Sequence, residues 1–413
     1  MEVYGELNRE LRLERVDCEV CEGVPRRCRL ESCPFYAHLI DLSKRLASKE
    51  SYVSGFTPPN VLVGKAGYPR VQVGPAVSPN DDLRSALTSQ PSVWLDRSID
   101  ELLTARLSLL LTRRQMRVTE VRDWNRIFEA IALSSMSLKP VDLEVKVIGS
   151  PALRPHFFAR SHPYGPSARL SEVKVVSNVR VPRAVDDLAH ERGLRVADAV
   201  KELCERGYDE YYITRLLSIG VLGTLRDRRL VPTEWSITAT DDIVSRIYLK
   251  GMRDYNAIHD FQLYSSSVLH NKAFVILLPT PWMYELLEGW VRFFSIYSDY
   301  EILRPRRDYA DNTGGAFYAV RLGLVKSLSR LRKRAGALVI FEIGEGWVPL
   351  GVWRFRELVK RALASKPEVH ETLDEALKSV RARLELPLDL YLSKSRLYKL
   401  LRTQRRLDEY LDQ

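Results

Sequence analysis

The sequence has little of what marks a membrane or secreted protein. Its longest uninterrupted apolar run covers residues 273–278, whereas a membrane-spanning helix needs about 20 apolar residues. The chain begins Met-Glu-Val-Tyr-Gly-Glu, without the basic segment and apolar run of a signal peptide. We therefore expect a cytoplasmic protein that does not contact a membrane.

The familiar catalytic motifs are also absent. The sequence contains no GxxxxGK[ST] loop, no GxGxxG after an expected strand, no GxSxG elbow and no HExxH motif. These absences argue against P-loop ATPases, dinucleotide-binding enzymes, α/β-hydrolases and metalloproteases of the HExxH type. There is likewise no internal repeat, low-complexity tract or heptad array.

Cysteine is scarce and unevenly distributed. Four of the five cysteines, Cys18, Cys21, Cys28 and Cys33, form the pattern C-x2-C-x6-C-x4-C. Four thiolates in one short loop can surround a tetrahedral Zn²⁺ ion. Because four protein ligands leave no open position, we expect a structural rather than a catalytic zinc site. The fifth cysteine, Cys204, lies in a helical pattern and is expected to fill the core.

Three other interpretations of this cluster stay open. Some cytosolic proteins of hyperthermophiles contain disulfides, so two disulfides are one alternative. A redox CxxC would leave Cys28 and Cys33 unexplained, and an iron–sulfur cluster takes four cysteines at other spacings. Arg26 and Arg27 lie within the cluster. They are candidates for contact with phosphates, or they balance the negative charge of zinc held by four thiolates.

Basic residues exceed acidic ones. The 413 residues include 63 Lys and Arg against 53 Asp and Glu, a formal net charge of +10. This excess favours a nucleic-acid partner, expected to be DNA, although a well-solvated surface would also account for it. Besides Arg26 and Arg27, the candidate nucleic-acid-binding residues are Arg306, Arg307, Arg332, Lys333 and Arg334.

The last ten residues contain a compact set of anchors. Leu407, Tyr410 and Leu411 would share one face of a tight helical turn, and Gln404 lies one turn earlier. Such a peptide inserts its apolar side chains into a hydrophobic groove on a partner protein. The alternative is a helix end whose Leu and Tyr pack on the body of the protein.

This terminal pattern resembles the PIP box, the motif by which replication and repair proteins bind the sliding clamp PCNA. Gln404, Leu407, Tyr410 and Leu411 stand at the motif positions. Leu411 departs from the motif, because a second aromatic residue is more usual there. The resemblance implies that PCNA is a partner.

Strand and helix patterns are mixed along the chain, and we expect an α+β protein. Its body would combine mixed sheet and helices, with a small N-terminal four-cysteine zinc module and a helical C-terminal region ending in a mobile tail. The expected parts are the zinc module (1–47), an α+β body (48–295), an α+β to helical C-terminal domain (296–400) and the PCNA-interacting tail (401–413).

Individual elements follow from periodicity. Strands are expected within 51–79 and over 141–148, 173–181, 261–278 and 338–343. Helices are expected over 40–47, 96–111, 118–136, 185–206, 282–296, 316–334, 352–363, 372–384 and 394–401. Residues 153–170 and 231–242 are expected to be irregular, with Thr240 or Asp241 capping the helix that follows.

Acidic residues, with nearby histidines and a lysine, are the remaining candidates for a catalytic site. Metal-dependent nucleases hold Mg²⁺ and a scissile phosphate with acids and a Lys at strand ends. The simpler interpretation is a helix cap, loop acids and hydrogen-bonded histidines. The candidates are Glu234, Asp241, Asp242, His259, Asp260, His270, Lys272, Glu342 and Glu345.

Asn312, Gly314 and Gly315 precede an expected helix. Backbone amides at such a helix start can bind a phosphate, or the segment is an ordinary loop that contains two glycines.

Taken together, the two ends resemble the archaeal Nre family of DNA repair proteins, which carry an N-terminal four-cysteine region and a C-terminal PCNA-interacting tail. Three internal stretches, 162–167, 232–238 and 311–315, also look like family sequence. The resemblance identifies 48–295 with the Nre N-terminal region and implies DNA repair with recruitment by PCNA, on DNA in the nucleoid. It supplies no reaction. The alternatives are a clamp-recruited metal-dependent nuclease, or another DNA-processing enzyme, and a scaffold that never touches DNA.

Overall fold

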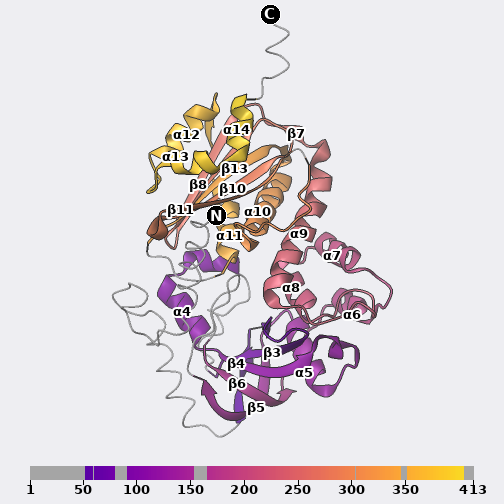
Figure 1. The fold of residues 1–413 in the computed structure, drawn as a ribbon. Helices are drawn as coiled ribbons and strands as arrows, with labels where there is room; N and C mark the ends of the chain where they lie inside the picture. The colour runs from indigo at the N-terminus through magenta and orange to yellow at the C-terminus, as the bar shows by residue number, and fades with distance from the viewer. Residues whose placement is uncertain are drawn as a thin grey trace, which may run out of the picture. The chain divides into compact units, whose positions relative to one another are not determined.

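The computed structural model describes residues 52–58, 60–79, 91–152, 165–302, 304–345 and 351–403 (Figure 1). In these residues helices and sheets are mixed, which confirms the predicted α+β class. The chain divides into two compact units. Unit 1 comprises residues 1–240 with 349–351, and unit 2 comprises residues 241–348 and 352–413. The predicted domain boundaries stay predictions.

Unit 1 is built on a six-stranded sheet. Its order is β1-β5-β6-β4-β3-β2, and every pairing is antiparallel except that between β4 and β6. The strands are β1 (Tyr52–Thr57), β2 (Val61–Val63), β3 (Arg70–Val77), β4 (Leu110–Arg117), β5 (Val141–Ala152) and β6 (Ser167–Val175).

The sheet curls until β1 meets the end of β3. The Phe56 amide donates to the Ser78 carbonyl at 3.1 Å, and the Ser78 amide donates to the Phe56 carbonyl at 2.8 Å. At Gly55 a Cβ atom would lie 2.0 Å from the Ser78 carbonyl oxygen, so only glycine permits this approach. Strands β1, β5, β6, β4 and β3 therefore close into a small barrel.

Alternation along the strands builds the core of this barrel. Val141, Leu143 and Val145 of β5 are buried, whereas the intervening Glu144 is exposed. Period-two patterning of this kind puts one side of a strand inside and the other in water. Strands β1, β3, β4 and β6 add Val53, Val77, Leu110, Ala168 and Leu170 to the same cluster. Full burial of each Val or Leu contributes roughly 1.5–3 kcal/mol.

Several helices complete unit 1. Helix α4 begins with a capping box, in which the Ser98 side chain accepts from the Glu101 amide and the Glu101 carboxylate accepts from the Ser98 amide. Helix α5 connects β4 to β5 and packs against β6. The helices are η2 (Pro91–Asp96), α4 (Ile99–Leu107), η3 (Val118–Arg122), α5 (Arg126–Met136), α6 (Arg183–His190), α7 (Val196–Glu205) and α8 (Glu210–Ser218).

Unit 2 contains a second six-stranded sheet, in the order β11-β10-β13-β9-β8-β14. Strands β10 and β13 are parallel, and the other neighbours are antiparallel. The strands are β8 (Phe261–Val268), β9 (Asn271–Leu278), β10 (Tyr284–Trp290), β11 (Ser295–Glu301), β13 (Gly336–Ile343) and β14 (Glu368–His370), and a separate short pair joins β7 (Asn256–Ala257) to β12 (Lys333–Arg334).

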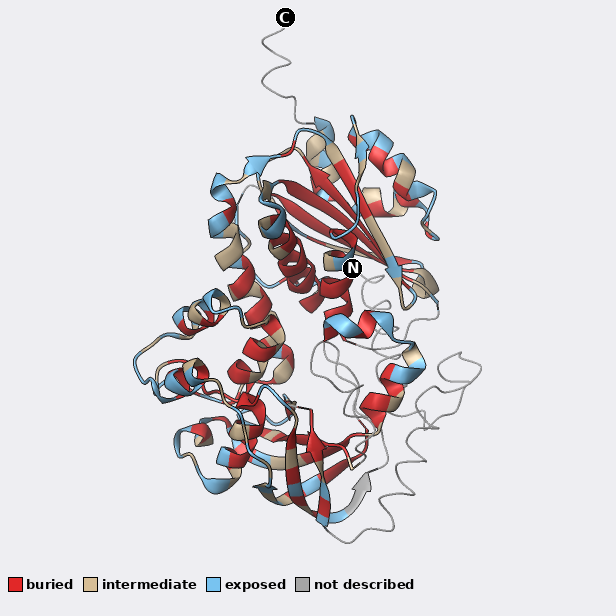
Figure 2. Cartoon of the chain, turned by 180° about the vertical axis from the view of Figure 1, so that it is seen from behind, coloured by how far each residue is buried: buried red, intermediate tan, exposed pale blue. Residues whose placement is uncertain are grey.

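Helices cover both faces of this sheet, and the central strands and α10 are buried along their lengths (Figure 2). On one face, Phe341 of β13 stacks on Phe355 of α11 with ring centroids 4.1 Å apart. The helices of unit 2 are η4 (Met252–Asp254), η5 (Val291–Phe293), α10 (Gly315–Leu331), α11 (Trp353–Ala362), α12 (Leu373–Arg381), α13 (Leu388–Lys394) and α14 (Arg396–Thr403); α9 (Thr233–Gly251) contains the division between the units.

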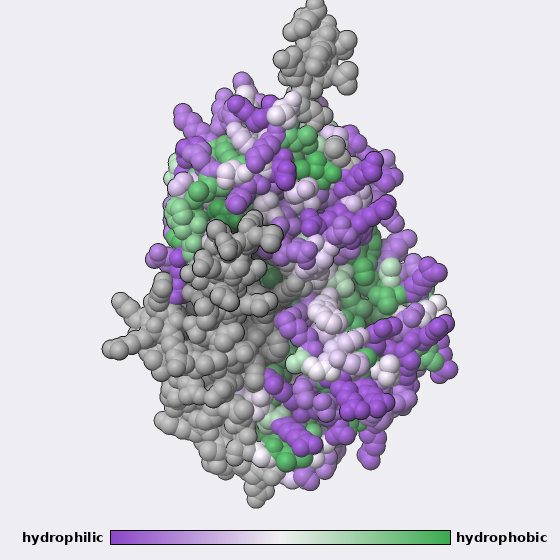
Figure 3. Space-filling view, viewed as in Figure 1, coloured by the Kyte–Doolittle hydropathy of each residue, from purple (hydrophilic) through white to green (hydrophobic). Residues whose placement is uncertain are grey.

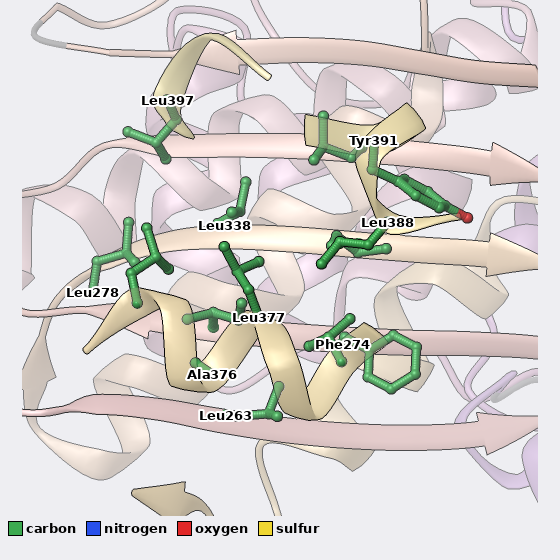
Figure 4. Packing of buried hydrophobic residues seen from close by; sticks show 14 of the residues in the cluster. Leu263, Phe274, Leu278, Leu338, Ala376, Leu377, Leu388, Tyr391 and Leu397 are labelled. Atoms are coloured by element: carbon green, nitrogen blue, oxygen red, sulfur yellow. The ribbon is translucent and has the colours of Figure 1, made fainter. Parts of the chain in front are cut away.

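The other face carries α12, α13 and α14 (Figure 4). Leu377 of α12, Tyr391 of α13 and Leu397 of α14 point onto the sheet. There they meet buried side chains that include Phe274 of β9 and Leu338 of β13. A single apolar cluster therefore holds the last three helices, including the one that ends the described chain.

Several sequence predictions are wrong. The helices predicted over 96–111 and 316–334 end earlier, because β4 begins at Leu110 and residues 333–334 form β12. Residues 282–296, predicted as a helix, form β10, η5 and the start of β11. Every residue of β10 is buried, so this strand lacks the alternation that would have identified it. Helix α9 begins at Thr233, so residues 233–242 are not irregular and Thr240 and Asp241 are not caps. Strand β6 begins at Ser167 within the predicted irregular stretch and ends at Val175, short of the predicted strand end at 181.

Other predictions are confirmed, among them the β8–β9 hairpin, strand β13 and helices α10 and α11. No helix in the described part of the chain is long and apolar enough to cross a bilayer. On the side shown in Figure 3, hydrophilic residues occupy most of the described surface and hydrophobic residues form separate patches.

Candidate nucleic-acid interface

Several predicted site residues lie outside the described residues. These are the zinc candidates Cys18, Cys21, Cys28 and Cys33, the basic residues Arg26 and Arg27, and the docking residues Gln404, Leu407, Tyr410 and Leu411.

Arg306 is turned into unit 2. Its guanidinium donates to the carbonyls of Tyr300, Asp308 and Tyr309 at 3.2, 3.0 and 2.9 Å, and it forms an ion pair with Asp299 at 3.1 Å. A side chain with this many partners holds the loop before α10. Its neighbour Arg307 is exposed.

The basic residues Arg332, Lys333 and Arg334 follow the end of α10. Arg332 is exposed and caps the helix in a left-handed conformation, with φ of 50°. Lys333 Nζ donates to Gln262 Oε1 at 3.3 Å, and Arg334 donates to the Arg253 carbonyl at 3.2 Å. Cations here also stabilise the negative end of the helix dipole, so these charges have a structural role on the surface of unit 2.

The acids of α9 do not converge. Glu234 pairs with Lys65 at 3.0 Å in unit 1. In unit 2 Asp241 pairs with Arg356, and Asp242 pairs with Arg321 and Arg246. Each carboxylate is thus neutralised by its own cation.

The other candidates are also separately placed. Glu342 is fully buried and accepts from Lys272, from the Leu386 amide and from the Tyr391 hydroxyl at 3.2, 3.0 and 3.0 Å. His270, with φ of 56°, forms the turn of the β8–β9 hairpin. Exposed candidates are His259, Asp260 and Glu345. Within the described ranges, no three His, Cys, Asp or Glu residues are grouped so that they could hold a metal ion.

A carboxylate of the protein occupies the turn before α10. Asp299 accepts from the backbone amide and the hydroxyl of Thr313 at 2.7 and 2.9 Å. Asn312 donates to the Ser298 carbonyl at 2.9 Å, and Gly314 has φ of 58°. The amide that an external anion would use at Thr313 therefore already has an acceptor, and Gly315 starts the helix.

The described residues do form a basic groove on the outside of the unit 1 barrel. The strands that line it, β3, β4, β5 and β6, are labelled in Figure 1. Its volume is about 710 Å³. Arginine is prominent in its lining, and none of the described residues that line it is acidic. They are Gln72 of β3, Arg113–Gln115 of β4, Ile148 of β5 and Ser167–Ser171 of β6.

Strand register explains how the groove is assembled. Arg113 and Arg169 are partners in the parallel β4–β6 pair, so their side chains project from the same face. Ile148 is the partner of Arg169 on its other side, and Gln72 is opposite Gln115. Like charges on neighbouring strands destabilise a sheet. Guanidinium groups on neighbouring strands of one face give the groove a chemistry that suits phosphates.

Sequence reasoning missed this groove because its arginines are far apart in the chain. Only the β4–β6 pairing brings Arg169 beside Arg113. Neither residue belongs to a long basic run, and the sequence signal was limited to two arginines and a glutamine, Arg113–Gln115, at the end of an apolar stretch.

Comparison with known proteins identifies the family to which the chain belongs. A model described as Archaeal Nre, N-terminal, matches residues 27–297, and one described as Archaeal Nre, C-terminal, matches residues 301–410. The chain belongs to the archaeal Nre family. The resemblance seen in the sequence is thereby confirmed for most of the chain, including the strands that form the groove.

Individual Nre proteins are similar over nearly their whole length. DNA repair protein NreA of Archaeoglobus fulgidus is 34% identical over 378 residues, which cover 90% of this chain and 94% of that protein. DNA repair protein NreB of the same organism is 34% identical over 408 residues, covering 96% and 100%. DNA repair protein NreA of Haloferax volcanii is 32% identical over 351 residues, covering 81% and 83%. No solved structure gave a significant match.

Proposed function

We propose that this protein acts in DNA repair, binds DNA in the basic groove of unit 1 and is recruited to the PCNA sliding clamp by Gln404, Leu407, Tyr410 and Leu411. The names of three Nre relatives support the repair role. The observation that supports DNA contact most directly is the groove itself, whose described lining residues include three arginines and no acid.

The groove offers chemistry that suits a nucleic-acid backbone. A guanidinium binds phosphate through two parallel N–H donors, and Arg113, Arg114 and Arg169 come from adjacent strands. Arg114 is held in place by donating to the Ser171 carbonyl at 3.2 Å. Binding through such contacts weakens as salt concentration rises. Arg307 and Arg332 are further exposed cations in unit 2.

Clamp recruitment is tested by substituting the terminal anchors. Tyr410→Ala combined with Leu411→Ala is expected to weaken PCNA binding by at least about thirtyfold, because buried aromatic and apolar anchors each contribute about 2 kcal/mol in such grooves. The dissociation constant for purified PCNA is measured by isothermal titration calorimetry without DNA.

The matched control is Asp408→Ala combined with Glu409→Ala, which changes the two residues between the anchors. This variant is expected to bind PCNA within about threefold of the unmodified protein, as non-anchor contacts contribute little. Equal affinity of the anchor variant and the unmodified protein would refute recruitment through this segment.

The zinc proposal rests on the spacing of Cys18, Cys21, Cys28 and Cys33. Elemental analysis is expected to find about one zinc per chain, and Cys18→Ser is expected to lower that content and to expose the N-terminal region to protease. Cys204→Ser is the control, because Cys204 lies in α7, and it should retain the metal. Folded protein purified without zinc would contradict this assignment.

A further inference from the structure

The barrel of unit 1 has a recognisable topology. Taken in chain order, its strands are β1 (first), β3 (second), β4 (third), β5 (fourth) and β6 (fifth). The first pairs with the second, the second with the third, the third with the fifth, the fifth with the fourth and the fourth with the first. Only the third and fifth are parallel, and helix α5 lies between the third and fourth. This is the strand order of the OB-fold, a five-stranded Greek-key barrel.

The topology and the groove point to the same place. OB-folds bind ligands across their second and third strands, beside the loops that follow the first and fourth strands. Here the second and third strands supply Gln72 and Arg113–Gln115 to the groove. The position of the groove on this face is a separate observation from the strand order.

An exposed aromatic pair lies at the loop between the first and second strands. Tyr68, two residues before β3, and Trp235 of α9 have ring centroids 5.3 Å apart, and they are 43% and 44% exposed. Large aromatic rings left this open to water are typical of stacking surfaces for nucleic-acid bases.

The start of α9 holds this loop in position. Thr233 Oγ1 accepts from the Val63 amide at 2.9 Å, and Glu234 pairs with Lys65 at 3.0 Å. Three consecutive residues of α9, including Trp235, therefore contact one loop. This gives a structural role to part of the 232–238 stretch, for which the sequence alone offered none.

We propose that the groove and the Tyr68–Trp235 pair form a binding site for single-stranded DNA. The groove lies on the outer face of these strands, where an unpaired chain can place its phosphates against the arginines. In a duplex the bases are already stacked on one another and cannot reach the aromatic pair. The choice of DNA as the ligand rests on the proposed function, whereas the preference for a single strand rests on the groove and the rings.

The positive charge of the groove indicates which of the known classes of OB-fold ligand it binds. OB-folds also bind oligosaccharides, but a neutral sugar cannot form the ion pairs with Arg113 and Arg169 that a phosphate can. A second arginine pair, Arg70 and Arg117, is cross-strand on β3 and β4. Two such pairs favour a polyanion.

The test measures binding of the full chain, without PCNA, to a labelled oligothymidylate and to a duplex of equal length. The single strand is expected to bind at least about tenfold more tightly. Arg113→Glu combined with Arg169→Glu should weaken single-strand binding at least about thirtyfold and reduce its salt dependence. Tyr68→Ala and Trp235→Ala should each weaken it about fivefold or more with the salt dependence unchanged, because stacking is not an ionic contact.

The matched control is Arg183→Glu combined with Arg192→Glu, two exposed arginines outside the groove, expected to stay within about threefold of the unmodified protein. Arg169→Gln, a milder change of an exposed side chain, repeats the test if the double variant does not fold. Equal binding of duplex and single strand, unchanged binding by the groove variants, or preference for a neutral glucan would overturn the inference. The first outcome leaves DNA repair standing, whereas loss of all DNA binding would also overturn the proposed DNA contact.

Discussion

Replacing Arg321 with alanine is expected to lower the free energy of unfolding by about 3–5 kcal/mol, the cost of breaking a buried ion pair by removing one partner. Arg321 is 1% exposed. Its guanidinium donates to Glu301 at 2.9 Å and to the Ser245 hydroxyl at 3.0 Å, and it pairs with Asp242. Without it, Glu301 keeps a buried charge without its cation.

The control for this experiment is Arg246→Ala. Arg246 also pairs with Asp242, at 2.8 Å, but its side chain is 45% exposed. Exposed ion pairs contribute about 0–1 kcal/mol, so the loss should be correspondingly small. Both variants are measured by urea unfolding. A loss below about 1 kcal/mol for Arg321→Ala would mean that the buried network does not stabilise unit 2.

Glu285→Ala is expected to lower the free energy of unfolding by about 3 kcal/mol or more, because buried donors left without an acceptor cost about 1–3 kcal/mol each. Glu285 lies on β10 and is fully buried. It accepts from the first amides of α14, Arg396 at 2.8 Å and Leu397 at 2.9 Å, and from the Ser395 hydroxyl. The carboxylate thus caps a helix from a neighbouring strand.

Glu368→Ala is the control for Glu285→Ala. Glu368 is a glutamate of the same sheet whose side chain is 40% exposed and pairs with Arg383 at 2.7 Å. Its removal should cost no more than about 1 kcal/mol. Amide hydrogen exchange locates the damage: protection in α14 should fall in Glu285→Ala and stay unchanged in Glu368→Ala. Unchanged protection in both variants would show that α14 does not depend on Glu285.

The stabilisation by Glu285 should also depend on pH. Burial raises the pKa of Glu285 above its usual value of 4.5, against the opposing effect of hydrogen bonds from Ser395, Arg396 and Leu397. The Glu285 carboxyl therefore keeps its proton to higher pH in the folded protein than in the unfolded chain. The difference in free energy of unfolding between the unmodified protein and Glu285→Ala should therefore decrease as pH rises from about 4.5. A difference that increases as pH rises from about 4.5 would contradict the raised pKa of Glu285.

Periodicity predicted those elements that have one buried and one exposed side. Strand β5, with the exposed Glu144 between buried neighbours, and helix α12 were found in this way. It failed for β10, because a strand covered on both faces has no alternation to detect. It failed at the start of α9, because contacts of Thr233 and Glu234 with the β1–β3 loop hold that segment helical, and such tertiary contacts override local preference.

The candidate site shows the same limit. Proximity in sequence suggested that Glu234, Asp241 and Asp242 act together, yet each faces a different cation. Arg113 and Arg169 are far apart in sequence and adjacent in the sheet. Barrel closure depends on the close approach of the Ser78 backbone to Gly55. No pattern along β1 predicts that this distant segment lies beside it.

Under the proposed clamp recruitment, the capped helix α14 would limit the distance between this protein and the clamp. Helix α14 ends at Thr403, and Leu407 follows four residues later. Four fully extended residues span at most about 14 Å. A ring that held Leu407 in its groove would therefore have unit 2 almost against its surface. Glu285, which caps α14 from inside that unit, would then fix the point at which the segment that links the protein to the clamp begins.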